Sequence, residues 1–140
     1  MLEVTAKWVG GWKFVGTDSG GREMKMDASV EGGGEGDGFR PAELPLMGLA
    51  GCTGIDTIEI IQKMRQPVES LELRVTAEKQ KDGPPGFAGV EIEYIIRGKG
   101  LSKEKIERAV RLSEDKYCTV SGALKRSTPV THKITIEETS

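Results

Sequence analysis

The chain has 140 residues, with 22 acidic and 20 basic side chains and a formal net charge of −2. This length predicts a single domain over residues 1–140. The absence of a basic surplus argues against a nucleic-acid partner, and no stretch approaches the ~20 apolar residues of a membrane span. The start of the chain lacks the basic-then-apolar order of a signal peptide. One histidine and two cysteines cannot alone form a four-ligand zinc site, and we expect neither a metal nor a cofactor.

The two cysteines, Cys52 and Cys118, indicate the cellular compartment. Secreted domains held by disulfides usually carry more cysteines in a shorter chain, so this pair is typical of a cytoplasmic protein with reduced thiols. If the two cysteines do form a disulfide, we expect it to be transient and catalytic. The alternative is that both are buried and act as small hydrophobic side chains.

The first part of the chain has the pattern of short strands joined by turns. Residues 3–8 and 23–27 alternate between apolar and polar side chains, which predicts half-buried strands. Gly10-Gly11 marks a turn before a second short strand over 12–15, residues 17–21 mark another turn, and the whole predicts an antiparallel meander. The glycine-rich residues 31–38 lack a phosphate-binding motif and carry acidic side chains that would repel phosphate. We interpret them as a mobile loop.

A long helix is predicted next, because Pro41 is suited to a first helical turn and Pro67 ends the pattern. Residues 44–55 contain no charged side chain, which predicts a helix buried all round. Glycines flank Cys52 on this helix, although glycine costs ~1 kcal/mol relative to alanine in a helix interior. They indicate either close contact with another helix or access to the Cys52 thiol.

The rest of the chain predicts further strands and helices. In order they are a strand over 68–78, a strand over 90–96, a helix capped by Ser102, a short helix ending near Lys125, and a strand over 130–137. Cys118 falls just after the first of these two helices. His132 lies in the final strand, and we interpret it as a strand residue whose polar atoms have partners. This element order predicts the α+β class.

Two motifs carry a family resemblance. Residues 46–56 read Leu-Met-Gly-Leu-Ala-Gly-Cys-Thr-Gly-Ile-Asp, and residues 116–120 read Lys-Tyr-Cys-Thr-Val. Together with residues 8–11 (Trp-Val-Gly-Gly) and 41–44 (Pro-Ala-Glu-Leu), they resemble the OsmC/Ohr family across essentially the whole chain. The two cysteine motifs are most similar to the small OsmC-like branch that reads Gly-Cys-Ser/Thr and Tyr-Cys-Ser/Thr.

The resemblance implies a fold and an activity. The fold would be an intertwined homodimer, with two long central helices packed together and covered by antiparallel sheets. The activity would be that of a cytoplasmic thiol peroxidase acting on organic hydroperoxides in oxidative-stress defence. Cys52 matches the attacking cysteine and Cys118 the resolving cysteine, whose disulfide a dithiol or thioredoxin-like donor would reduce.

The chain departs from the family pattern at the groups that activate the thiol. The family's arginine follows the first Gly-Gly turn, where this chain has Trp12. The family's glutamate follows the helix-opening proline, whereas here Ala42 stands there and the acid is shifted to Glu43. Arg40 is our candidate for the missing cation, and Arg22 is a second one. The predicted catalytic set is thus Cys52, Cys118, Arg40 and Glu43, and the alternative function is a non-catalytic dimer that binds a small apolar ligand.

Overall fold

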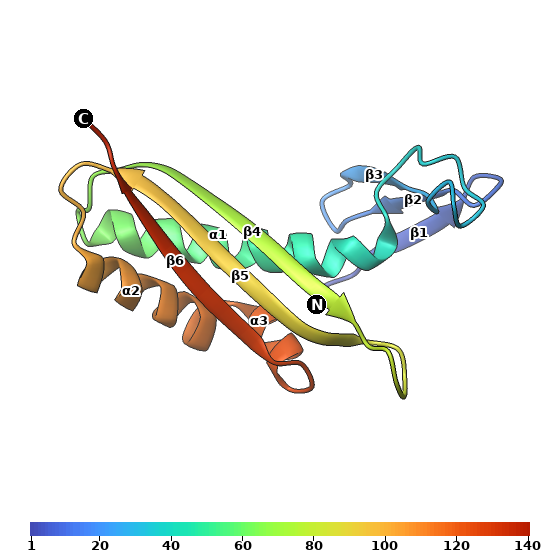
Figure 1. Cartoon of the computed structure of the whole chain (residues 1–140). Coiled ribbons are helices and arrows are strands. Elements are labelled where there is room, and N and C mark those ends of the chain that lie inside the picture. Colours follow the sequence, from blue (N-terminus) through green and yellow to red (C-terminus); the bar gives the residue numbers. More distant parts are fainter. The chain divides into compact units, whose positions relative to one another are not determined.

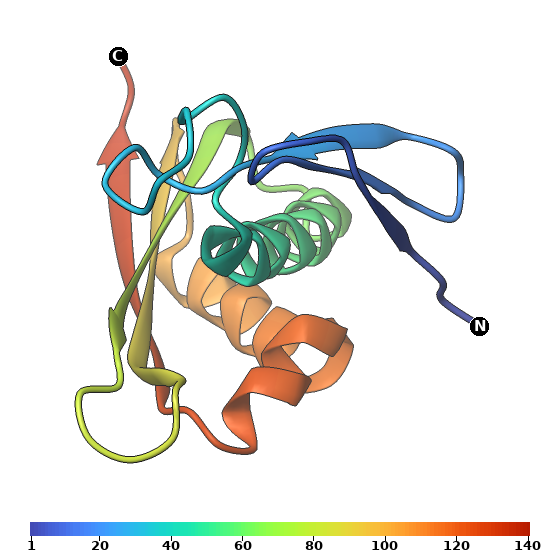
Figure 2. The ribbon, with the colours of Figure 1, turned by 90° about the vertical axis from the view of Figure 1, so that its right-hand side faces the viewer.

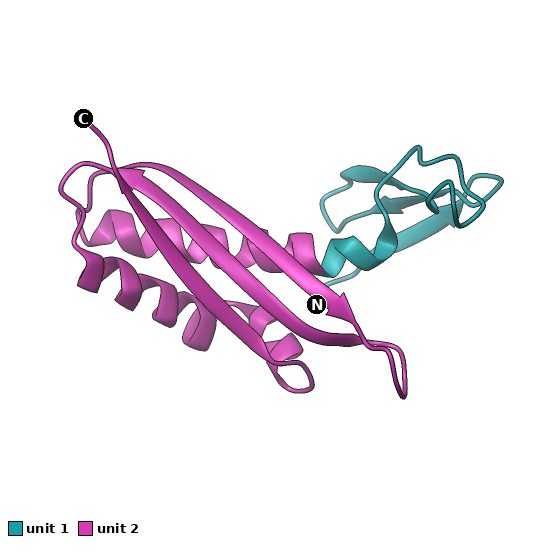
Figure 3. Cartoon of the chain, in the orientation of Figure 1, with its two compact units in different colours: residues 1–45 teal, residues 46–140 magenta.

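A computed structural model describes all 140 residues and divides them into two compact units, residues 1–45 and residues 46–140 (Figure 3). Each unit contains one three-stranded sheet, and the chain's helices lie mainly in the second unit. The combination of helices with mostly antiparallel sheets confirms the predicted α+β class.

The first unit contains an antiparallel meander of β1 (Thr5–Trp8), β2 (Phe14–Thr17) and β3 (Glu23–Met26). Gly10 and Gly11 form the first turn with φ values of 107° and 54°, which glycine adopts without strain. The antiparallel pairing of β1 with β2 and of β2 with β3 confirms the predicted meander. All four residues of β1 are exposed, however, so the prediction of a half-buried strand is wrong. The reason is that the first unit has only this one sheet and no long helix to cover it.

The glycine-rich loop after β3 is held in place by the buried carboxylate of Asp27. This carboxylate accepts backbone hydrogen bonds from Ala28 at 2.8 Å and from Glu35 and Asp37 at 3.1 Å each. These bonds, that from Asp37 foremost, lower the pKa of Asp27. Lys13 also pairs with Glu35 at 3.0 Å. Residues 31–38 thus have defined hydrogen-bond partners, and their interpretation as a mobile loop stays a prediction.

The predicted long helix is present as a 3₁₀ turn (Pro41–Glu43) followed by α1 (Leu44–Lys63). Its buried residues recur every fourth position and form one face: Leu49, Thr53, Thr57 and Ile61. The Thr53 hydroxyl donates to the Leu49 carbonyl at 2.7 Å, which explains how a threonine is accommodated there. On other faces Met47 and Ile55 are 47% and 67% exposed, so the prediction of burial all round is wrong for a single copy of the chain.

By length and composition alone, the 23 residues Pro41–Lys63 could cross a membrane. The expectation that no stretch approaches such a span is therefore wrong, because the apolar character continues beyond the charge-free residues 44–55 with few interruptions. Core helices of folded domains pass the same test, and one face of α1 contributes to the buried core of the second unit. We therefore interpret α1 as a core helix.

The second unit is a sheet covered on one face by helices (Figures 1 and 2). Its elements in chain order are the main part of α1, β4 (Val68–Lys79), β5 (Phe87–Gly98), α2 (Lys103–Leu112), a π-helical turn (Ser113–Tyr117), α3 (Thr119–Lys125) and β6 (Val130–Glu138). The central strand β5 pairs with β4 as an antiparallel hairpin and with β6 in parallel. The predicted hairpin is therefore confirmed, and the parallel pairing of β6 brings a late strand beside β5.

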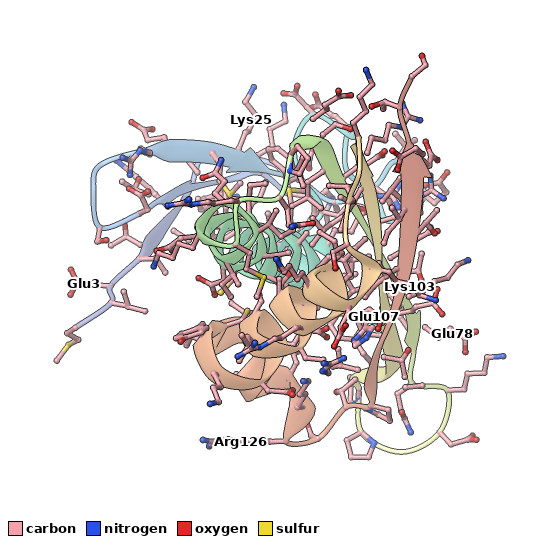
Figure 4. All side chains as sticks on the ribbon, turned by 90° about the vertical axis from the view of Figure 1, so that its left-hand side faces the viewer. Glu3, Lys25, Glu78, Lys103, Glu107 and Arg126 are labelled. Carbon is pink, nitrogen blue, oxygen red and sulfur yellow. The ribbon has the colours of Figure 1, made fainter.

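The core lies between this sheet and the helices. Side chains from β5, α1 and α2 dominate it, and Cys118 belongs to it with 5% exposure. The fully buried apolar members are Leu49, Ile61, Ile92, Tyr94, Ile96, Ile106, Ala109 and Val110. Charged side chains such as those of Lys103 and Arg126 lie at the periphery of the second unit (Figure 4). Cys118 is thus fixed by the packing of the domain and is not on a free surface.

Candidate active site

The structure brings Cys52 and Cys118 together from segments far apart in the chain. Cys52 lies half-buried on α1, and Cys118 lies buried where the π-helical turn ends and α3 begins. Both are free thiols, and the Cys52 side chain lies near enough to Cys118 to raise the pKa of the Cys118 thiol. Two thiols in contact can form a disulfide after one of them is oxidised.

A buried hydrogen bond links the segments that carry the two cysteines. The Ser113 hydroxyl donates to the carbonyl of Thr53 at 2.9 Å, and both residues are fully buried. Thr53 follows Cys52 directly, and Ser113 begins the π-helical turn. At the other end of this turn, the backbone N–H of Cys118 donates to the Ser113 carbonyl at 2.9 Å. Ser113 therefore fixes the position of the Cys118 backbone relative to α1.

The environment of Cys118 keeps it protonated at neutral pH. Burial raises the pKa of the Cys118 thiol to about 12, and the neighbouring Cys52 thiol contributes to the increase. The backbone N–H of Ser121 donates to the sulfur at 3.3 Å and offsets part of this effect. Cys118 is consequently a poor nucleophile on its own, and its attack on any partner requires a group that accepts its proton.

A buried acid lies next to this site. Glu114 is 4% exposed, and its Oε2 lies 2.7 Å from Nδ1 of His132 on β6. Burial raises the pKa of Glu114, while His132 and then Lys125 counteract the increase. The His132 side chain is 35% exposed, so the pair reaches from the core to solvent. No group of three or more metal-ligating side chains is present in the chain.

Sequence reasoning missed the Glu114–His132 pair, although a signal was available. Glu114 follows Val110 by four residues and Ile106 by eight, which is the spacing of the buried face of α2. A carboxylate on that face predicts a buried acid that needs a partner. The partner could not be inferred in the same way, because His132 is brought to Glu114 by the parallel pairing of β5 and β6.

Tyr94 completes the buried polar cluster. It is fully buried on β5, and its hydroxyl has no hydrogen-bond partner. Its ring stands edge-on to the His132 ring with 6.3 Å between the centroids. Burial, followed by the charge of Glu114, raises the pKa of Tyr94, and Cys118 also contributes. Tyr94 and Cys118 thus belong to the same buried core, in which the ring of Tyr94 lies beside the histidine that pairs with Glu114.

The other two predicted site residues lie in the first unit. Arg40 and Glu43 are both exposed, and the backbone N–H of Glu43 donates to the Arg40 carbonyl at 3.0 Å across the 3₁₀ turn. Cys52 and Cys118 belong to the second unit, so the structure describes each pair within its own unit. The second candidate cation, Arg22, forms an ion pair with Asp18 at 3.2 Å. The roles of Arg40 and Glu43 remain predictions.

Comparison with known proteins identifies the family. Residues 34–133 match the sequence model of the family described as OsmC-like protein. Protein YhfA of Escherichia coli K12 is 35% identical over 132 residues, which cover 94% of this chain and 95% of YhfA.

Two solved structures share the fold. One, described as a hypothetical protein from Aquifex aeolicus VF5, has 25% identity and a TM-score of 0.86, with 100% of this chain and 98% of that chain covered. Another, from Legionella pneumophila, is described as an organic hydroperoxide resistance protein OsmC and a predicted redox protein. It has 18% identity and a TM-score of 0.71, with 96% of each chain covered. On the match to the family and to YhfA, this chain belongs to the OsmC-like protein family.

Proposed function

We propose that this protein is a two-cysteine thiol peroxidase that reduces organic hydroperoxides. The observation that carries the proposal is the pair of free, neighbouring thiols, Cys52 and Cys118, within an OsmC-like fold. A structural neighbour described as an organic hydroperoxide resistance protein supports the substrate class. We further propose that the protein works in the cytoplasm, in defence against oxidative stress, and belongs to the small OsmC-like branch.

Cys52 is the attacking cysteine in this proposal, because it is the more accessible of the two thiols. Its thiolate attacks an oxygen of the hydroperoxide, the S–O bond forms, and the O–O bond breaks. The oxygen that leaves takes up the proton released by the thiol, so the products are an alcohol and a sulfenic acid at Cys52.

Cys118 resolves the sulfenic acid. Its sulfur attacks the Cys52 sulfur, the S–S bond forms, and the S–O bond breaks. The leaving hydroxide and the thiol proton of Cys118 form water. One hydroperoxide and two thiols thus give one alcohol, one water and one disulfide. A dithiol or thioredoxin-like donor then transfers two electrons and two protons to restore both thiols.

The proposal includes a cation and a second copy of the chain. We propose that Arg40 stabilises the Cys52 thiolate and the leaving oxygen, with Glu43 orienting the guanidinium. The exposed apolar side chains of Met47 and Ile55 on α1 support a homodimer in which this helix packs against its copy. Glycines on the same helix would allow the close approach that such packing needs.

A second candidate function is the binding of a small apolar ligand without catalysis. A hollow of about 430 Å³ in the first unit supports it, with lining residues that include Val4, Ala6, Met24, Met26 and Leu44. Trp12 stands where catalytic family members carry arginine, which also favours this alternative.

Adding one equivalent of cumene hydroperoxide to the reduced protein tests the proposal. Peroxidase activity predicts the loss of two thiols per chain and the release of one equivalent of cumyl alcohol. The variant Cys52→Ser should consume no peroxide. Unchanged thiols in the wild-type protein would contradict the proposal. Cumyl alcohol bound in calorimetry, together with unchanged thiols, would support the ligand-binding alternative.

A further inference from the structure

Glu114 is a buried ionisable group that has no role in the steps of the peroxidase cycle described above. Glutamate is rarely buried unless it is paired, and Glu114 is 4% exposed with His132 at 2.7 Å. The neighbouring acid, Asp115, is exposed and pairs with Lys125 at 3.0 Å, as surface carboxylates commonly do. The contrast between these consecutive residues indicates that the position of Glu114 serves a specific role.

Glu114 and Cys118 lie close together through local structure. The π-helical turn Ser113–Tyr117 carries Glu114 and leads directly into Cys118, and the backbone N–H of Cys118 closes the turn onto Ser113. Tyr94 on β5 belongs to the same buried core as Cys118, and its ring stands edge-on to that of His132, the partner of Glu114, with 6.3 Å between the centroids. The Tyr94 hydroxyl has no hydrogen-bond partner, so it is free to donate to one group and accept from the other.

We propose that Glu114 accepts the Cys118 thiol proton through the Tyr94 hydroxyl when Cys118 attacks Cys52, and that His132 connects Glu114 to solvent. This inference rests on the proposed two-thiol mechanism. In the step, the Cys118 proton moves to Tyr94 while the Tyr94 proton moves to Glu114. The Cys118 thiolate forms the S–S bond, and hydroxide leaves the Cys52 sulfenic acid. Glu114 then returns its proton by way of His132 and solvent, and the hydroxide becomes water.

The electrostatics of the cluster suit this transfer. Only a thiolate attacks efficiently, whereas burial holds Cys118 in its protonated form. Burial also raises the pKa of Glu114. The pKa of this proton acceptor is therefore closer to that of the Cys118 thiol, the proton donor. The charged or titratable groups that face Glu114 are His132 on β6, Lys125 on α3, Tyr94 on β5 and the adjacent Asp115.

A disulfide reagent isolates the Cys118 step from peroxide chemistry. Excess 4,4′-dithiodipyridine converts the accessible Cys52 to a mixed disulfide and releases one thiopyridone. Cys118 then displaces the second thiopyridone, so stopped-flow absorbance resolves two phases. In Glu114→Gln we expect the second phase to slow at least about tenfold, with the first phase unchanged. Asp115→Asn is the matched control on the next residue, and it should leave both phases unchanged.

The pH profile separates proton transfer from a merely structural role. The wild-type second phase should slow as the pH falls through the raised pKa of Glu114, because the protonated carboxyl accepts no proton. In Glu114→Gln the rate should show no such inflection and rise only at alkaline pH, where hydroxide deprotonates Cys118. Tyr94→Phe keeps the ring and removes an unpartnered hydroxyl, so it should fold and show the same slow second phase.

Several results would overturn the inference. An unchanged second phase in Glu114→Gln, or in Tyr94→Phe if the glutamine variant does not fold, excludes the relay. Equal slowing of both phases, or an unaltered pH inflection, shows a structural role only. If the reagent gives the expected result while cumene hydroperoxide leaves the thiols intact, the relay stands and the proposed peroxidase function fails.

Discussion

Replacing Ser113 by alanine tests how the two cysteine segments are joined. The Ser113 hydroxyl is fully buried and donates to the Thr53 carbonyl at 2.9 Å. Alanine removes this bond, but the carbonyl keeps its helical partner within α1, so no acceptor is left wholly unsatisfied. The loss is therefore that of one buried hydrogen bond, about 1 to 1.5 kcal/mol in the free energy of unfolding. The disulfide-forming step should slow as well, because the π-helical turn is no longer tied to α1 beside Cys52.

Ser121 provides the matched control. It is also a fully buried serine near Cys118, but its hydroxyl has no hydrogen-bond partner. Ser121→Ala should therefore leave the stability unchanged or increase it, since an unpaired buried hydroxyl is costly. Urea unfolding of the reduced proteins at one fixed concentration measures both effects. If Ser121→Ala is as destabilising as Ser113→Ala, the assignment of the linking hydrogen bond is refuted.

Three further predictions concern activation, assembly and acid stability. Arg40→Ala should slow peroxide consumption at least about tenfold, about 1.4 kcal/mol, whereas Arg22→Ala should change it little; equal rates for wild type and Arg40→Ala would eliminate Arg40. Light scattering should give a homodimer at micromolar concentration, and a stable folded monomer would exclude an obligate dimer. The pKa of Asp27 is lowered, so its carboxylate stabilises the folded state. This contribution is complete above the ordinary aspartate pKa near 4 and is lost as the pH falls below it. Asp27→Asn should thus be less stable at neutral pH and less sensitive to acid, as circular dichroism would show; an unchanged acid profile would contradict this.

Much of the second unit could be predicted from local patterns. The alternation in β4 and β5 and the turn residues between them indicated the hairpin, and the structure shows it. Ser102 was identified as the cap of α2, and its hydroxyl accepts from the backbone N–H of Lys105 at 3.3 Å. In each case the residues that interact lie near one another in the sequence. The expectation of one domain over residues 1–140 remains a prediction.

The sequence was less informative where the partner of a group lies far along the chain. Residues of β1 alternate as a half-buried strand does, yet their burial depends on a second layer that the first unit does not contain. Asp27 and the loop that it fastens look like ordinary turn residues until the chain folds back. Glu114 is followed by a second acidic residue, Asp115, so the pair is typical of a solvent-exposed surface. Only the packing of α2 and the position of β6 show that Glu114 is buried beside His132.

The family resemblance identified the cysteine pair, and the structure places the two thiols near enough for Cys52 to raise the pKa of Cys118. Spacing alone could not have done so, because two buried cysteines that act as small hydrophobic side chains fit the same pattern. The roles of Arg40 and Glu43 depend on how the first unit and a second copy of the chain approach Cys52. Local sequence carries no information on that approach, which is why these two residues need the mutational test.

Mass spectrometry of the peroxide-treated single-cysteine variants tests the central claim most directly. The wild-type chain should lose two hydrogen atoms on forming an internal disulfide. Cys118→Ser should instead gain oxygen atoms at Cys52 and over-oxidise, because no thiol is left within reach to resolve the sulfenic acid. Cys52→Ser should remain unoxidised, since Cys118 is buried and protonated. Oxygen on Cys118 in Cys52→Ser, with Cys52 still reduced in Cys118→Ser, would contradict the assigned roles, and unaltered masses in all three proteins would contradict the peroxidase itself.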